Sequence, residues 1–257
     1  MNSNNDLRTI KADLHVHTVL SPCADVEMIP PLIVQAALSQ GISLIAITDH
    51  NATANFKAVK TAALGTDLSI LPGMELQTRE EVHVLCLFDD ETQLEEWQKL
   101  VDPTLPKIEN DPEHFGEQFV VDETGEFIRR EKQLLLTSSS FTMSEAWNRI
   151  NALGGLMIPA HVNRTAFGVI ANLGFIPTDI SIEALEISRH IGPEQARKTF
   201  PQIGNYPLIQ SGDVHRLEEF LGSTHLTISS PTISELRMAF ANQDGRSCHI
   251  VQQQSEK

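Results

Sequence analysis

Residues 11–17 read Lys-Ala-Asp-Leu-His-Val-His, a short run typical of a β-strand that places His15 and His17 two positions apart. Alternate side chains of a strand leave the same face, so the two imidazoles would stand side by side and could bind one ion. On a helix the two rings would point apart. A single His-x-His pair also arises by chance, so its meaning depends on the rest of the chain.

Histidine and carboxylate residues recur at the ends of other predicted strands. The segments are Thr48-Asp49-His50, Gly73-Met74-Glu75, Glu81-Val82-His83, Pro159-Ala160-His161 and Gly212-Asp213-Val214-His215. Imidazole and carboxylate ligands in this mixture suit zinc, manganese or iron. We therefore predict a cluster of two or three divalent ions, in which one carboxylate such as Glu75 bridges two of them.

Strand and helix patterns alternate around these residues. The order is strand 10–14, helix 30–40 with Gly41 after it, strand 43–47, helix 54–64 and strand 68–71. Repeated strand–helix–strand units indicate a parallel α/β sheet. In barrels built this way the functional site lies at the carboxyl ends of the strands, which is where the candidate ligands fall.

The regular alternation breaks after Glu75. Too few residues separate Glu75 from the next strand, 82–88, for a crossover helix, so we expect a hairpin and an irregular barrel. The remaining elements are predicted as helix 89–100, helix 142–153, strand 156–159, strand 181–187, helix 193–200, strand 207–210, strand 226–229, helix 232–242 and strand 247–251.

The stretch from about 102 to 141 shows no clean periodicity. Much of it is rich in Pro, Glu and Asp and holds too few apolar residues for its own core. We expect residues 1–257 to form a single barrel domain in which this stretch, after the fourth strand, is an insertion or lid.

The charge balance bears on the choice of partner. The net charge is −15 and the pI about 5.0, so no basic stripe is available to follow a nucleic-acid backbone. Bound cations can reverse the local field and hold a phosphate group within an acidic protein. We expect a small phosphate ester or a nucleotide as substrate and no long duplex nucleic acid.

The sequence also bears on compartment. Its first residues lack a secretory signal, and no apolar run reaches the length of a membrane span, so we expect a cytoplasmic protein with no membrane partner. The three cysteines, Cys23, Cys86 and Cys248, are widely spaced, which indicates neither a disulfide framework nor a structural zinc site.

In their order, these segments resemble the PHP (polymerase and histidinol phosphatase) domain family of metal-dependent phosphoesterases. The matching pieces are Asp13-Leu-His-Val-His-Thr18, Ile47-Thr-Asp-His50, Pro72-Gly-Met-Glu75, His83, Pro159-Ala-His161 and Gly212-Asp-Val-His215. The resemblance covers nearly the whole chain. It implies an α/β fold, a distorted (β/α)7 barrel of the PHP type, with a two- or three-metal site.

The resemblance also implies a ligand set. His15, His17, Glu75 and Asp213 would hold the first ion, Glu75, His83 and His161 the second, and His50 and His215 a third. Many family members carry another ligand where this chain has Pro22, so the third ion lacks its usual extra donor. Asp25 or Cys23 could substitute, and a small packed residue is the alternative for Cys23.

Three further residues are candidates for contact with substrate. Arg164 lies just beyond His161, where a guanidinium could take two phosphate oxygens at once, although a surface role fits equally well. Arg189 and His190 follow the strand 181–187 and could reach the same pocket. His190 could then donate a proton to the leaving group.

Our leading hypothesis is a phosphoesterase that hydrolyses a phosphomonoester or nucleotide phosphate. A metal-bound hydroxide would attack phosphorus in line, with Glu75 and Asp213 holding the ions. The chain carries neither a Gly-x-Ser-x-Gly elbow nor a Gly-x-x-x-x-Gly-Lys loop. The alternatives are a metal-dependent amidohydrolase-like enzyme and a non-catalytic metal-binding domain.

Overall fold

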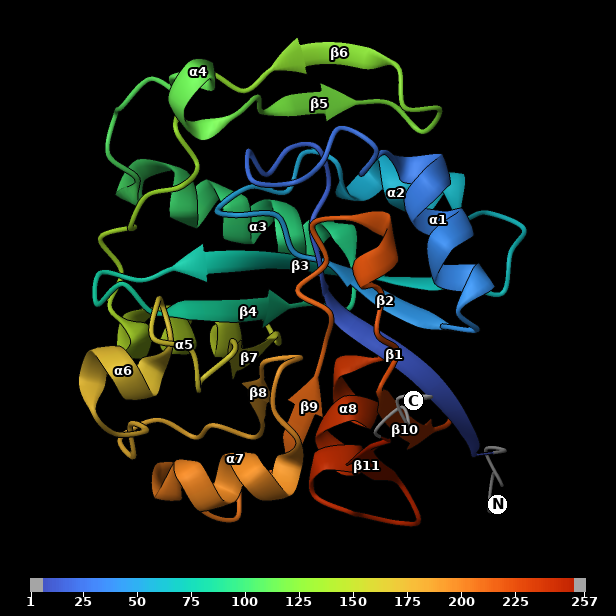
Figure 1. Ribbon diagram of the computed structural model, residues 1–257, viewed down its shortest axis with the longest axis vertical. Coiled ribbons are helices and arrows are strands. Elements are labelled where there is room, and N and C mark those ends of the chain that lie inside the picture. Colours follow the sequence, from blue (N-terminus) through green and yellow to red (C-terminus); the bar gives the residue numbers. More distant parts are fainter. Residues whose placement is uncertain (1–6, 252–257) are drawn as a thin grey trace.

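A mixed seven-stranded sheet carries most of the histidine-bearing segments (Figure 1). The computed structural model describes residues 7–251. The strand order is β11–β10–β1–β2–β3–β4–β7. The strands are β1 (Arg8–Val16), β2 (Leu44–Ile47), β3 (Ser69–Gln77), β4 (His83–Leu87), β7 (Leu156–Pro159), β10 (Thr224–Ile228) and β11 (Ser247–Ile250).

The centre of this sheet follows the expected pattern. β1, β2 and β3 are parallel neighbours, and their connections contain the helices α1 (Pro30–Ser39) and α2 (Phe56–Ala62). β3 and β4 then pair as an antiparallel hairpin, with Gln77 opposite His83, which confirms the predicted break in the alternation. β4 and β7 are also antiparallel.

Two further strands lie outside this sheet. β8 (Leu185–Ile187) and β9 (Leu208–Gln210) form a separate parallel pair, with β8 next to β7 and β9 next to β11. The fold is therefore mixed α/β with a curled sheet. Hydrogen bonds among the described strands do not close a single seven-stranded barrel.

Alternate residues along the strands serve two hydrophobic clusters. Leu85 and Leu87 of β4 face one cluster with Leu44 and Ala46 of β2, whereas Cys86 faces the other. This alternation follows from the period of two in a strand, and it explains why the strands are apolar on both faces. Cys86 is thus a core residue.

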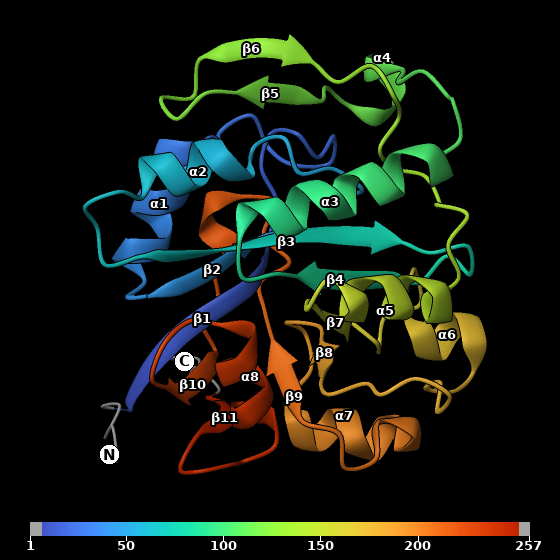
Figure 2. The same cartoon turned by 180° about the vertical axis from the view of Figure 1, so that it is seen from behind.

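Helices cover the outer side of the sheet. Figure 2 shows α3 (Glu91–Val101) and α5 (Met143–Ala152) over β3, β4 and β7. Both helices begin with a capping box, Asp90 with Gln93 and Thr142 with Glu145. The other helices are α6 (Val169–Leu173), which was not predicted, α7 (Pro193–Thr199) and α8 (Ile233–Phe240), with single turns η2 (Pro201–Ile203) and η3 (Leu217–Glu219).

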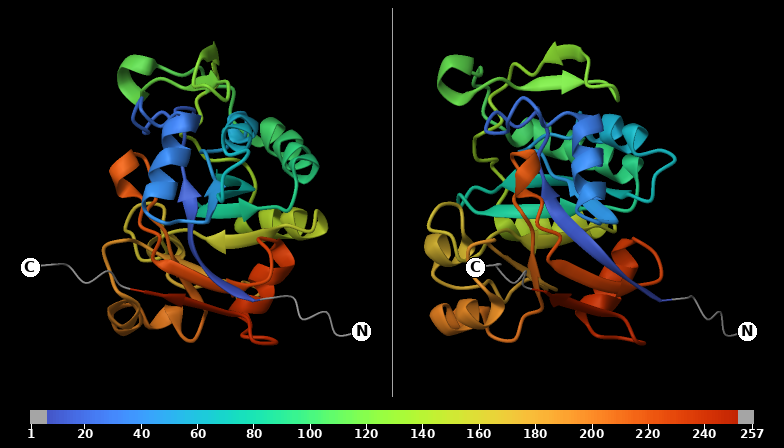
Figure 3. Two further views of the ribbon diagram at one scale, coloured as in Figure 1. Left: turned by 90° about the vertical axis from the view of Figure 1, so that its right-hand side faces the viewer. Right: turned by 45° about the vertical axis from the view of Figure 1, so that its right-hand side comes forward.

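The segment 102–141 is ordered and projects at one end of the molecule (Figure 3). It contains η1 (Asp102–Thr104), α4 (Pro112–Phe115) and the hairpin of β5 (Phe119–Val121) and β6 (Phe127–Arg130). Asn55, just before α2, fixes the hairpin: its amide donates to the Phe119 carbonyl at 2.9 Å and its carbonyl accepts from the Val121 amide at 3.0 Å. Among the described helices we find none with the length and apolarity needed to cross a membrane.

Candidate metal centre

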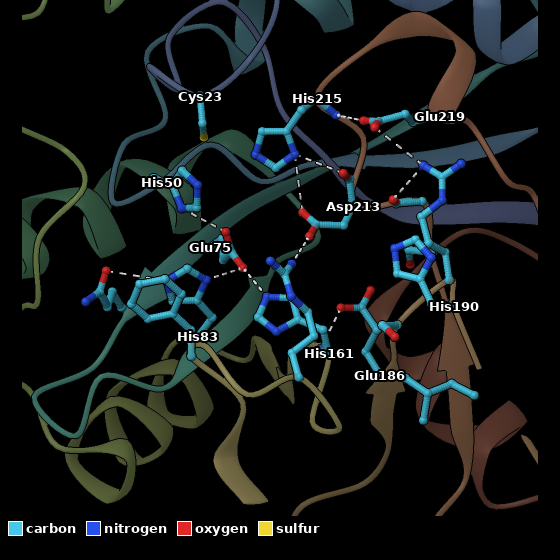
Figure 4. A pocket seen from close by; sticks show the side chains of 18 of the residues that line it. Cys23, His50, Glu75, His83, His161, Glu186, His190, Asp213, His215 and Glu219 are labelled. Atoms are coloured by element: carbon cyan, nitrogen blue, oxygen red, sulfur yellow. Dashed lines mark hydrogen bonds and ion pairs between the residues drawn. The ribbon is translucent and has the colours of Figure 1, made fainter. Parts of the chain in front are cut away.

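One cavity of about 780 Å³ collects the residues that the sequence singled out (Figure 4). Six of the eight residues with a ligand role implied by the resemblance line it, namely His50, Glu75, His83, His161, Asp213 and His215. The remaining two, His15 and His17, are fully buried and lie against Glu75 and Asp213. Residues from both ends of the chain therefore meet at one place.

Sheet topology brings them together. His15 is the last but one residue of β1, His17 follows that strand and His50 follows β2, so these residues share the carboxyl edge of parallel strands. β4 runs in the opposite direction, so its first residue, His83, reaches the same edge. His161 follows β7, which is antiparallel to β4 and therefore ends there too.

Glu75 is the centre of the cluster. Its Oε1 lies 2.8 Å from His83 Nδ1, 3.1 Å from His161 Nε2 and 3.2 Å from His15 Nε2. Its Oε2 lies 2.8 Å from His50 Nδ1 and 3.5 Å from His17 Nε2. Burial would raise the pKa of Glu75, but the rings of His83, His15 and His50 hold it well below its usual range. Each oxygen therefore faces a different group of imidazoles, as a bridging carboxylate requires.

Asp213 supplies a second carboxylate. Its Oδ1 lies 3.3 Å from His15 Nε2 and 3.6 Å from His17 Nε2. Burial opposes ionisation, yet His15 and His17 keep the pKa of Asp213 well below its usual range. Asp213 has φ +50° and His161 has φ +29°, a region that L-residues rarely adopt. Such backbone conformations concentrate at functional sites.

Several buried nitrogens of the cluster have no hydrogen-bond partner. They are His15 Nε2, His17 Nε2 and His161 Nδ1. A buried polar atom left unpartnered costs about 1–3 kcal/mol, so an arrangement of this kind is expected where a ligand completes it. Three groups of donor atoms are close enough to share an ion: His15–His17–Asp213, His50–Glu75–His83 and His17–His50–His215. The residues therefore fit a divalent cation.

Other polar groups orient the imidazoles from behind. Glu186 Oε2 lies 3.0 Å from His15 Nδ1 and also accepts from the His161 amide at 3.0 Å. Ser21 Oγ lies 2.9 Å from His17 Nδ1 and donates to Asp49 Oδ1 at 2.7 Å. Carboxylates and hydroxyls in such positions set which ring nitrogen is free to bind a metal.

The sequence analysis missed Glu186. The available signal was a carboxylate inside the apolar strand Ala184-Leu-Glu-Ile187, where a charge has no place in an ordinary core. Asp13 is a second buried carboxylate near the cluster, but its hydrogen bonds come from the backbone: it accepts from the Gly212 amide at 3.0 Å and from the Leu221 amide at 2.9 Å. Burial raises the pKa of Asp13 to about 6. It holds in place the turn that carries Asp213.

The three candidate substrate contacts, Arg164, Arg189 and His190, all line the cavity. Arg164 Nη1 lies 2.5 Å from Asp213 Oδ2. Arg189 is near Glu219, with 3.7 Å between Nη1 and Oε1. Sequence reasoning missed two other lining residues, Arg216 and Phe167. The Phe167 ring stacks on His83 with 4.3 Å between centroids.

The two candidates for the extra ligand fall in different places. Asp25 is exposed and does not line the cavity, and its carboxylate accepts from the Glu27 amide at 3.3 Å. Cys23 is exposed and lines the cavity. Partial desolvation acts to raise the pKa of the Cys23 thiol, but the neighbouring rings of His50 and His215 lower it to about 6.

Sequence comparisons with known proteins identify a family and one relative. The PHP domain model matches residues 13–151. A 5′-3′ exoribonuclease from Haemophilus influenzae is 31% identical over 87 residues, which are 33% of this chain and 31% of that protein. The chain therefore spans less than a third of its curated relative's length.

Two solved structures share the fold. The lesion-specific endonuclease Q from Pyrococcus furiosus gives a TM-score of 0.69 at 18% identity, covering 94% of this chain and 58% of that one. An endonuclease Q complex with a 27-mer duplex that has an abasic lesion at the active site gives 0.68 at 17% identity, covering 93% and 58%.

These relatives correct the expected partner. We excluded a long duplex nucleic acid and favoured a small phosphate ester or nucleotide because the net charge is −15. That expectation was wrong: a protein of this fold binds a 27-mer duplex, and the curated relative is an exoribonuclease. Net charge averages over the whole surface, whereas Arg164, Arg189 and Arg216 stand on the cavity wall where a phosphate would lie.

Proposed function

Because this chain belongs to the PHP domain family, we propose that it is a metal-dependent hydrolase that cleaves phosphodiester bonds of nucleic acid. The observation that carries the proposal is Glu75, whose two oxygens face separate groups of histidines at 2.8–3.5 Å. Two adjacent cations can hold the attacking and leaving oxygens of one phosphoryl group. The arginines on the wall suit the rest of a polyanionic substrate.

The ligand roles belong to this proposal. His15, His17 and Asp213 would hold one ion together with Glu75, and His83 and His161 would hold a second, also together with Glu75. His50 and His215 would contribute to a third. When bound, the ions supply positive charge beside the phosphoryl oxygens and acidify a water molecule. Zinc, manganese and iron all suit this donor set.

The protein's own residues would bind and orient the substrate. Arg164 and Arg189 present guanidinium groups that pair with phosphate oxygens in a planar, bidentate manner. Asp213 now neutralises Arg164, so substrate phosphate would compete for that contact. Phe167 offers an apolar ring at the rim, where a nucleobase can stack.

Proton transfer to the leaving oxygen would come from the wall opposite the bridge. His190 is exposed and lines the cavity, so it can approach a substrate without opening the core. Its exchangeable proton would pass to the departing sugar oxygen.

Phe115 and Leu136 bring the segment 102–141 to the same cavity, and we assign that segment the role of a lid over the nucleic acid.

The chain's organisation is part of the same proposal. We assign residues 1–257 to a single distorted (β/α)7 barrel domain of the PHP type. Support comes from the β8–β9 pair, which stands between β7 and β11 and so covers the open side of the curled sheet.

The test combines elemental analysis with a substrate panel. Protein purified with its native metals would be incubated with end-labelled RNA and DNA, single-stranded and duplex, with and without an abasic site. We expect metal-dependent cleavage of at least one of them, with shortened fragments resolved on a gel. Protein that carries its metals and cleaves none of these substrates would overturn the proposal.

A further inference from the structure

A thiol stands beside the third group of histidines. Cys23 lies in the loop between β1 and α1, within hydrogen-bonding reach of the His50 and His215 rings. Figure 4 shows its sulfur directed toward these two rings from the side opposite Glu75. The two rings and His17 form the group whose donor atoms lie within 4.8 Å of one another. A fourth donor of a different chemical kind therefore faces this group.

The loop that carries Cys23 is held rigidly. Thr18 donates its amide to Asp49 Oδ1 at 2.7 Å and its hydroxyl to Asp49 Oδ2 at 2.8 Å. The Ala24 amide donates to the Ser21 carbonyl at 2.9 Å, and the Asp25 amide donates to the His215 carbonyl at 2.8 Å. The last bond ties the loop directly to a residue of the histidine group, so the thiol keeps its place relative to His215.

His17 provides an independent sign of a missing ligand. Its side chain is fully buried and its Nε2 has no hydrogen-bond partner. The Ser21 hydroxyl donates its proton to Asp49, so it can only accept from His17 Nδ1, which must carry the ring proton. Nε2 is then an unprotonated lone pair. The His17 ring lies 4.1 Å from that of His215 and 4.5 Å from that of His50, centroid to centroid.

The donor set of this corner differs from that of the bridge. Around Glu75 and Asp213, carboxylate oxygens supplement the imidazoles. On the side of Cys23 the donors are the imidazoles of His50 and His215 and one sulfur, and the nearest acidic candidate in sequence, Asp25, does not line the cavity. Thiolate with imidazole is the combination that favours zinc and disfavours magnesium, calcium and manganese.

We propose that Cys23, as a thiolate, joins His50 and His215 to form a zinc-selective site next to Glu75, with the His17 ring packed against both imidazoles. The inference deepens the proposed function, since it assigns one ion of the cluster to a soft ligand set. It concerns binding alone, so its test needs no substrate. Phosphodiester cleavage can fail while this site stands, and the reverse also holds.

The other cysteines supply matched controls. Cys86 is buried in the core, and Cys248 of β11 has its sulfur 3.7 Å from the Leu208 carbonyl. Neither lines the cavity. Cys248→Ser therefore removes a thiol of the same chain without touching the site, whereas Cys23→Ser changes the site by a single atom.

The first measurement uses cobalt(II) in place of zinc. A sulfur ligand to cobalt gives a charge-transfer absorption in the near ultraviolet that nitrogen and oxygen ligands do not give. Metal-free protein would be titrated with cobalt(II) under anaerobic conditions. We expect the band in wild type and in Cys248→Ser, and its loss in Cys23→Ser and Cys23→Asp. Cobalt binding to wild type without the band, or a band unchanged in Cys23→Ser, would overturn the proposal.

The second measurement covers the case of a variant that folds poorly. Wild-type protein, metal-free or loaded with zinc, would be treated with iodoacetamide, and alkylation of each cysteine followed by mass spectrometry. We expect zinc to slow alkylation of Cys23 at least about tenfold and manganese to slow it far less. Equal alkylation of Cys23 with and without zinc would refute the assignment without any variant being made.

Discussion

Two buried carboxylates of this protein, Glu75 and Glu235, are surrounded in opposite ways. Both are inaccessible, with 1% and 8% of the residue exposed. Glu235, on α8, accepts from Arg246 Nε at 3.1 Å, Arg246 Nη2 at 2.9 Å and the Ser229 amide at 2.8 Å. A cation and an amide therefore satisfy its two oxygens.

Glu75 lies among imidazoles instead of a permanent cation. Three ring nitrogens around it and Asp213 remain without hydrogen-bond partners, those of His15, His17 and His161. A protein that only needed a stable core would pair these atoms internally, as it does at Glu235. The comparison therefore separates the cluster around Glu235, whose charges stabilise the fold, from the cluster around Glu75, whose unpaired nitrogens fit a ligand.

The largest effect is expected from a substitution of Glu75, the carboxylate that lies among imidazoles. Glu75→Gln removes the carboxylate charge at the centre of the cluster, so we expect turnover in the proposed phosphodiester cleavage to fall by about a thousandfold or more. The unfolding free energy of metal-free protein should change little, because a neutral amide is easier to bury than a carboxylate. Turnover and urea denaturation measure the two quantities. Retained turnover would contradict the bridging role.

Removal of metal should come next in size. A ligand that binds only the folded state stabilises it by about 2.7 kcal/mol when present at a hundred times its dissociation constant. We therefore expect a chelator to lower the melting temperature of wild type and of Glu235→Gln clearly, and that of Glu75→Gln much less. Calorimetry measures the melting temperatures. An equal decrease in all three proteins would remove the distinction between the two clusters.

Glu186 offers a smaller test within the cluster. It lies behind His15, with 3.0 Å between Oε2 and His15 Nδ1, and should fix the ring without touching an ion. We expect Glu186→Gln to weaken metal affinity about 10–100-fold while leaving the number of ions unchanged. A chromophoric chelator in competition measures the affinity. An affinity equal to that of wild type would show that His15 needs no orienting carboxylate.

The smallest effect belongs to Glu235. Its hydrogen bonds from Arg246 lower the pKa to about 2, against an ordinary value of 4.5. A lowered pKa means that the charged form stabilises the fold, so the contribution is complete above about pH 4.5 and declines as pH falls toward 2. We expect Glu235→Gln to lower the free energy of unfolding by about 1–2 kcal/mol at pH 7 and to leave the proposed cleavage activity unchanged.

The pH series checks the sign of this last effect. Urea unfolding of wild type and Glu235→Gln should differ most near neutral pH and converge as pH falls from 4.5 to 3. A difference that grows with acidity would contradict the assigned direction.

Much of the architecture could be predicted from local pattern. The hairpin after Glu75 could be predicted from the short connection between the two strands, because a crossover needs more residues than the sequence has there. Expected helices such as 30–40 and 142–153 appear close to their predicted bounds, as α1 and α5. By contrast, the strand expected over 181–187 is only Leu185–Ile187, and the short helix α6 was missed.

The errors share a cause, which is that they depend on atoms far apart in sequence. Net charge could not show that Arg164, Arg189 and Arg216 converge on one cavity, so the exclusion of a duplex partner was wrong. Likewise, nothing local distinguishes Asp25 from Cys23 as the residue that faces the histidines.

The sequence by itself determined which residue types stand at the strand ends, because periodicity and strand length depend on neighbouring residues. It thereby determined the family and the kind of ion expected. Only the tertiary structure decided which atoms are left unpaired and which second carboxylate stands behind His15, since Glu186 is 171 positions away. Sheet register and loop anchoring set such distances, and both depend on the whole fold.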